Sequence, residues 1–283
     1  YALLAALFYG MSAPFSKLLL AQLSPTFLAA LLYLGAGLAM AALGRVRAFD
    51  SPAEQPLSRT DIPYLIAMVL LDIAAPVLLL MGLQTATPAT VSLLNNFEIA
   101  ATALIAAVWF RERVGRRLWA AIGLITAACI LLTVEDFSAL AFSGGALLAL
   151  LASVCWGFEN NTTRVLSGKD PRQTVMVKGF GSGLGALILA EALGEISGPA
   201  GCIAGALLLG ALAYGCSVYC YIRAQRQLGA ARTGIYYAFA PFIGVALSFW
   251  LVGQPLGAAF CTALGIMLAG TYLAVTEPGR SGR

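Results

Sequence analysis

The sequence predicts an all-α integral membrane protein with ten transmembrane helices, arranged as two inverted five-helix repeats. Three observations predict this fold class: ten long apolar stretches, basic residues confined to alternate gaps between them, and a weak similarity between the two halves of the chain. The composition agrees, because 60% of the 283 residues are hydrophobic and only 11% are charged. In soluble domains the charged share is about a quarter.

Each apolar stretch is long enough to cross a bilayer, whose hydrocarbon core requires about 20 residues of a helix that rises about 1.5 Å per residue. Thr87 and Pro88 open the fourth stretch as an N-cap followed by proline at the first helical position. Pro14 and Pro241 interrupt the first and ninth stretches near their middles, which makes them candidate hinges. In chain order the stretches cover residues 2–20, 26–44, 62–83, 88–110, 118–134, 144–165, 173–194, 202–224, 233–252 and 258–275.

The basic residues fix the expected orientation. Every Lys and Arg except Lys17 lies in or beside an even-numbered gap or in the tail 277–283: Arg45, Arg47, Arg59, Arg111, Arg113, Arg116, Arg117, Arg164, Lys169, Arg172, Lys178, Arg223, Arg226, Arg232, Arg280 and Arg283. Two odd-numbered gaps carry acids instead, namely Glu135, Asp136, Glu191 and Glu195. The positive-inside rule therefore predicts that the even gaps, the tail and, after ten crossings, the N-terminus are cytoplasmic.

The two halves resemble each other in the order of their features. A shift of 147 residues places Tyr9-Gly10 over Trp156-Gly157 and Lys17 over Arg164, and a shift near 142 places Gly123 over Gly265. We therefore predict a first repeat over residues 1–135 and a second over 143–276. Because each repeat crosses the membrane five times, the two must have opposite orientations. Inverted repeats are a common plan of secondary transporters, which open a central site alternately to the two sides.

Several classes of protein are disfavoured. The basic residues behind the pI of 8.8 are spread over short loops, so we expect no nucleic-acid partner. The sequence contains no G-x-x-x-x-G-K-[ST] motif, which argues against a self-contained ATP pump. It contains no His, which excludes a Ser-His protease and an H-E-x-x-H metalloprotease. We therefore expect no catalytic residues, no cofactor and no metal, although Cys216 and Cys220 share a helix face.

Polar side chains inside the apolar stretches indicate where a cavity lies. A charged side chain at membrane depth costs at least about 2.5 kcal/mol and needs a partner, water or a function. Asp72, Glu98 and Glu159 are such residues, and Asn95, Glu98 and Thr102 recur at the spacing of one helix face. Asp72 has Lys17 and Lys178 as candidate partners, and Lys178 has the alternative of snorkelling to the surface. The cluster of four glycines from Gly179 to Gly185 predicts close helix packing.

The chain resembles the drug/metabolite transporter superfamily, and within it the EamA-type ten-helix exporters, over essentially its whole length. The resemblance rests on Tyr9-Gly10, Trp156-Gly157, Thr87-Pro88-Ala89-Thr90-Val91, Phe110-Arg111-Glu112-Arg113, Gly229-Ala230-Ala231-Arg232, Ala240-Pro241-Phe242 and Gly253-Gln254-Pro255. Within that group the chain looks most like the bacterial aromatic amino acid exporters. Two departures stand out, because Glu98 replaces the usual Pro of the first half and Arg111 replaces the usual Gly before Glu112.

The resemblance implies a non-enzymatic secondary transporter that exports amino acids and related small metabolites across the bacterial inner membrane by alternating access. An amino acid needs acceptors for its ammonium, donors for its carboxylate and an apolar surface for its side chain. We predict that its binding residues are Tyr9, Ser12, Asn95, Asn96, Glu98, Trp156, Glu159, Asn160, Tyr214, Tyr236 and Tyr237. The predicted coupling or gating residues are Glu98, Asp72, Lys17, Pro14 and Pro241.

Three alternatives stay open at this point. A nucleotide-sugar or other metabolite or drug transporter of the same superfamily would want cations that face the cavity. An intramembrane aspartyl enzyme would want a close acid pair, which Asp72 and Glu98 supply poorly. A pore or a lipid-handling protein is the third. The expected partners are the small-molecule substrate and the bilayer, and a monomer is a reasonable expectation.

Overall fold

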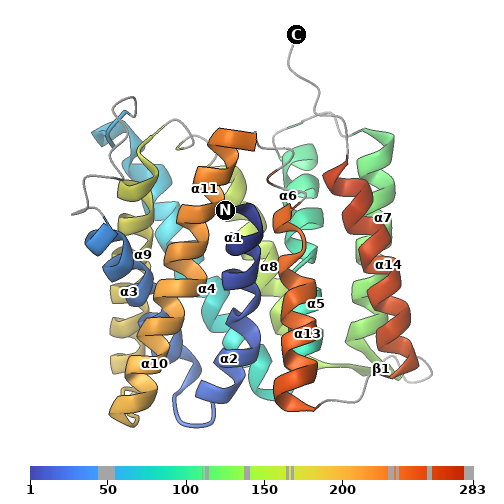
Figure 1. Ribbon diagram of the computed structural model, residues 1–283, viewed down its shortest axis with the longest axis horizontal. Coiled ribbons are helices and arrows are strands. Elements are labelled where there is room, and N and C mark those ends of the chain that lie inside the picture. Colours follow the sequence, from blue (N-terminus) through green and yellow to red (C-terminus); the bar gives the residue numbers. More distant parts are fainter. Residues whose placement is uncertain are drawn as a thin grey trace.

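The computed structural model describes residues 1–43, 55–109, 111, 115–136, 141–163, 166, 169–228, 233, 236–253 and 257–276. These residues form a bundle of helices that run roughly side by side (Figure 1). The elements are α1 Ala2–Gly10, α2 Ser12–Leu19, α3 Pro25–Leu43, the 3₁₀ turn η2 Arg59–Asp61, α4 Ile62–Thr85, α5 Pro88–Leu94, α6 Phe97–Val108, α7 Arg116–Thr133, β1 Val134–Asp136, β2 Ala141–Phe142, α8 Gly144–Thr163, α9 Pro171–Ala192, α10 Ala200–Gly210, the π-helical turn η4 Ala211–Cys216, α11 Ser217–Leu228, α13 Ala240–Val252 and α14 Ala258–Val275.

The all-α membrane fold is confirmed. Eight helical stretches of the described residues are long and apolar enough to cross a bilayer. The predicted sixth and ninth stretches complete the ten: α8 is a 20-residue helix that carries Glu159, and α13 is a shorter apolar helix. One detail was not predicted. After α7 the chain returns through a two-stranded antiparallel ribbon, in which Val134 of β1 pairs with Phe142 of β2.

Several of the predicted crossings are broken rather than continuous. The first breaks at Met11, because Pro14 has no N–H to donate to the carbonyl of Gly10. The fourth breaks at Asn95 and Asn96 without any proline. There the backbone N–H of Asn96 donates to the Leu93 carbonyl at 3.2 Å, and its side-chain amide donates to the same carbonyl at 3.4 Å. This local bonding competes with the helical ladder and ends α5.

Pro241 likewise follows a break. The predicted ninth stretch is interrupted by a turn at residues 238–239, and Pro241 lies in the first turn of α13 directly after it. A proline is well tolerated there, because the first N–H groups of a helix have no partner inside the helix. The eighth crossing changes from α10 to α11 through the π-helical turn η4, which contains Tyr214.

The packing of the helices repeats when the two halves are exchanged. α3 packs on α9 and α7 on α14, each helix against its counterpart in the other half. The pair α4 and α8 is matched by α11 and α1, and the pair α6 and α8 by α13 and α1. Figure 1 shows α7 and α14 together at one edge of the bundle and α3, α9 and α10 at the other, with α1 and α8 between them.

Glycines allow the closest helix contacts, as predicted for the cluster in α9. A Cβ atom on Gly179 would lie 2.5 Å from the backbone nitrogen of Gly37 in α3. A Cβ atom on Gly183 would lie 2.8 Å from the backbone nitrogen of Leu34. Small residues of this kind drive helix association in membranes, because they let backbones approach each other. The α3–α9 contact places the start of α9 beside the cavity described next.

Candidate functional site

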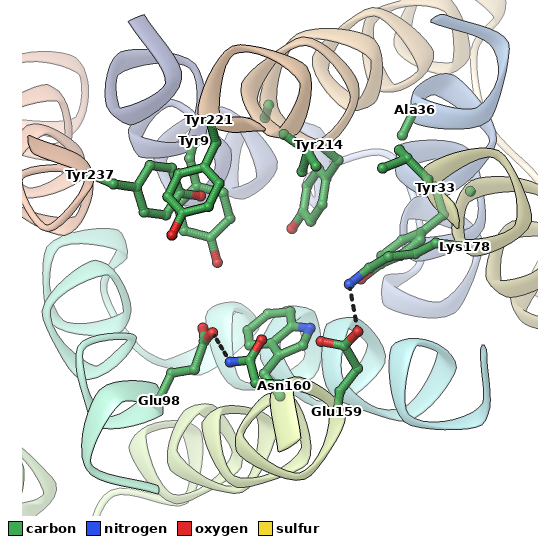
Figure 2. A pocket seen from close by; sticks show the side chains of 15 residues that line it. Tyr9, Tyr33, Ala36, Glu98, Glu159, Asn160, Lys178, Tyr214, Tyr221 and Tyr237 are labelled. Atoms are coloured by element: carbon green, nitrogen blue, oxygen red, sulfur yellow. Dashed lines mark hydrogen bonds and ion pairs between the residues drawn. The ribbon is translucent and has the colours of Figure 1, made fainter. Parts of the chain in front are cut away.

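A cavity of about 420 Å³ lies between the two halves of the chain (Figure 2). Its lining comes from α1, α3, α6, α8, α9, the region of η4 and α11, and the turn before α13. The lining residues are Tyr9, Tyr33, Ala36, Glu98, Trp156, Glu159, Asn160, Val175, Lys178, Gly179, Ala213, Tyr214, Val218, Tyr221 and Tyr237. Ligand cavities commonly have volumes of about 300–1,000 Å³, so this one suits a small molecule.

Two walls of different chemistry face each other across the cavity. Figure 2 shows Glu98, Asn160 and Glu159 on one side and four tyrosines, Tyr9, Tyr214, Tyr221 and Tyr237, on the other. The tyrosine rings contact one another, with centroids 4.9 Å apart for Tyr221 and Tyr237 and 5.7 Å apart for Tyr9 and Tyr237. We call these two sides the acid wall and the tyrosine wall.

Glu98 owes its position to the break in the fourth crossing. It lies in the first turn of α6, where the positive end of the helix dipole stabilises a carboxylate. Asn160 of α8 donates from Nδ2 to Glu98 Oε1 at 2.7 Å and to Thr102 Oγ1 at 3.3 Å. The asparagine therefore orients Glu98 while one side of the carboxylate faces the cavity.

Lys178 connects two further carboxylates. Its Nζ lies 3.1 Å from Asp72 Oδ2 and 3.3 Å from Glu159 Oε1. The Asp72 side chain is fully buried and also accepts a hydrogen bond from the Tyr33 hydroxyl at 3.0 Å. Burial of a charge is tolerated when it is paired and hydrogen-bonded, and this network meets both conditions. It joins α3, α4, α8 and α9 at one end of the acid wall.

The sequence of the whole bundle matches one family model twice. The model of the EamA-like transporter family covers residues 1–134 and again residues 143–276. The chain belongs to the EamA-like transporter family. It is therefore a multi-pass membrane transporter and not an enzyme, with a small-molecule substrate and the lipid bilayer as its surroundings.

Two individual proteins are similar to this EamA-like transporter. An uncharacterized transporter of Methanothermobacter thermautotrophicus is 26% identical over 287 residues, which cover 95% of this chain and 83% of that protein. A protein of known crystal structure superposes with a TM-score of 0.68 at 18% identity, over 96% of this chain and 94% of its own. At that identity the second likeness shows the fold alone.

The structure brings most of the predicted binding residues of the EamA-like chain to one cavity: Tyr9, Glu98, Trp156, Glu159, Asn160, Tyr214 and Tyr237 are all in its lining. Ser12 lies behind the tyrosine wall, where its hydroxyl donates to that of Tyr214 at 3.1 Å.

Three predicted binding residues lie elsewhere. Asn95 and Asn96 form the break between α5 and α6 and are not in the cavity lining. Of the face expected for Asn95, Glu98 and Thr102, the last two lie together, because Asn160 donates to both. Asn96 is buried and accepts a hydrogen bond from Thr271 of α14 at 3.4 Å. Tyr236 precedes Tyr237 in the same turn and is 41% exposed, since neighbouring residues of a helical turn do not face the same way.

The predicted coupling residues do not lie together in the structure. Of the two partners expected for Asp72, the structure selects Lys178. Lys17 instead donates to the backbone carbonyls of Leu83, Gln84 and Ala86 at the C-terminal end of α4. A cation is stabilised there, because the last carbonyls of a helix lack partners and carry the negative end of its dipole.

Tyr33, Tyr221 and Lys178 line the cavity but are absent from the predicted binding set. Lys178 carried a signal, since it is a cation well inside an apolar stretch. Tyr33 carried none beyond its hydroxyl, because a single tyrosine in an apolar helix is commonly an interfacial anchor. The family motifs around Glu112, Gly229–Arg232 and Gln254 lie outside the described residues.

Proposed function

We propose that this EamA-like transporter exports amino acids and related small metabolites across the bacterial inner membrane, with both termini in the cytoplasm. One observation carries the substrate class: Glu98 and Glu159 face the tyrosine wall across a cavity of about 420 Å³. Carboxylates accept hydrogen bonds from an ammonium group, and tyrosine hydroxyls can donate to a carboxylate. The tyrosines and Trp156 supply a broad apolar surface with polar tips that tolerates varied side chains.

Alternating access between inverted five-helix repeats, residues 1–135 and 143–276, is the mechanism we propose. The exchange symmetry of the helix contacts supports it, since two similar halves of opposite direction can swap conformations. The cavity approaches the side of the basic gaps, because its lining includes Val175 and Lys178 near the start of α9, just beyond Lys169.

On the opposite side, helix contacts near the odd-numbered gaps close the bundle. Lys17 joins α2 to the end of α4, and Ser24 Oγ donates to the Glu195 carbonyl at 3.2 Å. A Cβ atom on Gly82 would lie 2.5 Å from the Gly145 carbonyl oxygen, so α4 and α8 also meet closely there. With the basic gaps in the cytoplasm, these contacts fit a state that receives its substrate from the cytoplasm.

A nucleotide-sugar substrate fits less well. Phosphate groups need cations, and the cation in the cavity lining, Lys178, already contacts two carboxylates. The remaining lining residues are aromatic, apolar, acidic or amide. An added anion would therefore meet Glu98 and Glu159.

Transport into proteoliposomes tests the proposal. The purified full chain is reconstituted, and uptake of labelled Phe, Met and Thr is compared with uptake by empty vesicles, in competition with unlabelled amino acids and nucleotide sugars. We expect uptake of at least one of the three that amino acids inhibit and nucleotide sugars do not. If no amino acid enters faster than into empty vesicles, the substrate class is wrong.

A further inference from the structure

The contacts of Lys178 are unequal on its two sides. Asp72 is sealed from the cavity with none of its side chain exposed, and it is fixed by Tyr33 as well as by Lys178. Glu159 lines the cavity and keeps 7% of its side chain exposed. Lys178 itself is 26% exposed, and Figure 2 shows its contact with Glu159. Asp72 thus anchors the Lys178 ammonium, whereas Glu159 contacts the ammonium and also lines the cavity.

The charges of this corner do not balance. Asp72, Glu98 and Glu159 are three acids, and Lys178 is the cation that contacts two of them. The single ammonium of Lys178 cannot neutralise both Asp72 and Glu159. Binding of a second cation from the cavity next to Glu159 is therefore electrostatically favourable. Any such cation competes with Lys178 for the same oxygens. The cost of that competition is limited, because Lys178 keeps Asp72 as its partner.

A different role for Lys178 is to bind the carboxylate of the substrate. The geometry disfavours it, because a substrate carboxylate at Nζ would lie beside Glu159 and Asp72, both within 3.3 Å of that nitrogen. Like charges so close destabilise each other in a site of low dielectric constant.

We propose that Lys178 is a tethered counter-cation of the binding site. In the empty cavity the Lys178 ammonium is bound to Glu159. The ammonium group of an incoming ligand displaces the Lys178 ammonium towards Asp72. The competition sets the affinity for amines and prevents Glu159 from holding them too tightly for release. This inference rests on the proposed function, because it assumes that the ligand carries an ammonium group.

Binding of phenethylammonium to the detergent-purified full chain tests the inference apart from transport. The dissociation constant is obtained from the rise of the thermal unfolding midpoint with ligand concentration. The double variant Lys178→Met with Asp72→Asn removes the competitor and its anchor together, so that Asp72 is not left as an unpaired charge and Glu159 is open to the ligand. We expect it to bind phenethylammonium about fivefold or more tightly than the wild type. Glu159→Gln should bind it more weakly than the wild type.

A matched control exists on the same protein. Lys169 and Asp61 form a second pair with the same 3.1 Å separation but outside the cavity lining. Lys169→Met with Asp61→Asn should leave the affinity for phenethylammonium unchanged. Should the cavity double variant fail to fold, Lys178→Gln alone carries the same expectation, because the amide still donates a hydrogen bond to Asp72.

Equal or weaker binding of phenethylammonium by the cavity variant overturns the inference, as does a lack of binding to every protein tested. Loss of phenylalanine binding with unchanged phenethylammonium binding would instead assign Lys178 to the substrate carboxylate. The two proposals also fail separately. If phenylalanine is not transported but the cavity variant binds phenethylammonium more tightly, the amino acid proposal is wrong and the role of Lys178 stands.

Discussion

Glu98→Gln is the substitution that separates binding from coupling. The amide has the shape of the carboxylate, and its oxygen can still accept the 2.7 Å hydrogen bond from Asn160 Nδ2. The position in the first turn of α6 is also kept. Only the charge changes, so the variant should fold normally. It should bind a substrate ammonium more weakly, and it cannot take up a proton at this position.

The size of the binding effect follows from the kind of hydrogen bond. Bonds to charged groups contribute about 1.5–3 kcal/mol and neutral ones about 0.5–1.5 kcal/mol, so the substitution should cost about 1.4 kcal/mol. That corresponds to about a tenfold weaker binding of the substrate. The coupling effect is all-or-none, because an amide cannot carry a proton through the cycle. A proton-coupled carrier without Glu98 should lose accumulation and its pH dependence altogether.

Two flux measurements in proteoliposomes distinguish these effects. Exchange of labelled for unlabelled amino acid at equilibrium needs binding and conformational change, whereas accumulation driven by a pH gradient also needs proton transfer. Glu98→Gln should retain exchange at saturating substrate and lose the driven accumulation. Glu191→Gln, an exposed glutamate at the end of α9, is the matched control and should behave as wild type. Wild-type accumulation by Glu98→Gln over the whole pH range would refute the reasoning.

Three further substitutions test the packing and the charges. Gly179→Ala should lower the thermal unfolding midpoint, because the added Cβ atom overpacks the contact with α3 at a cost of about 1–3 kcal/mol, more than alanine gains in helix propensity. Gly123 has open space around it, so Gly123→Ala should raise the free energy of unfolding by about 0.8–1 kcal/mol. Lys17→Met should lower the thermal unfolding midpoint, because it removes the cation that binds the carbonyls at the end of α4. Lys17→Arg keeps a cation there and should have a midpoint close to that of the wild type. Equal midpoints for the two variants would show that Lys17 does not cap α4. Asp72→Asn should lower the free energy of unfolding by at most about 3–5 kcal/mol, because Lys178 keeps its ion pair with Glu159. An unchanged free energy of unfolding would show that the ion pair of Asp72 and Lys178 does not stabilise the fold.

The crossings were predictable because apolar length is a property of the local sequence. The termini of α4, α8 and α14 agree with the predicted stretches to within about two residues. The break at Asn95 and Asn96 was not predictable in the same way, because it depends on the Asn96 side-chain amide, which bonds locally to the Leu93 carbonyl and also to Thr271 of the distant helix α14. The acid wall was found from polar residues in apolar stretches, whereas the partner of Asp72 required the distance between α4 and α9, which no local pattern contains.

The cavity combines a symmetric scaffold with asymmetric chemistry. The shift of 147 residues that aligns the halves relates Trp156 to Tyr9 and Glu159 to Ser12, so α8 of the acid wall corresponds to α1 of the tyrosine wall. Glu98 of α6 likewise corresponds to Pro241 of α13. Because the helices of the two halves pack symmetrically while their charges do not repeat, we expect the proposed amine to bind in one orientation. A rearrangement that exchanges the conformations of the two repeats would leave the acid wall in place and change only the side from which it is reached.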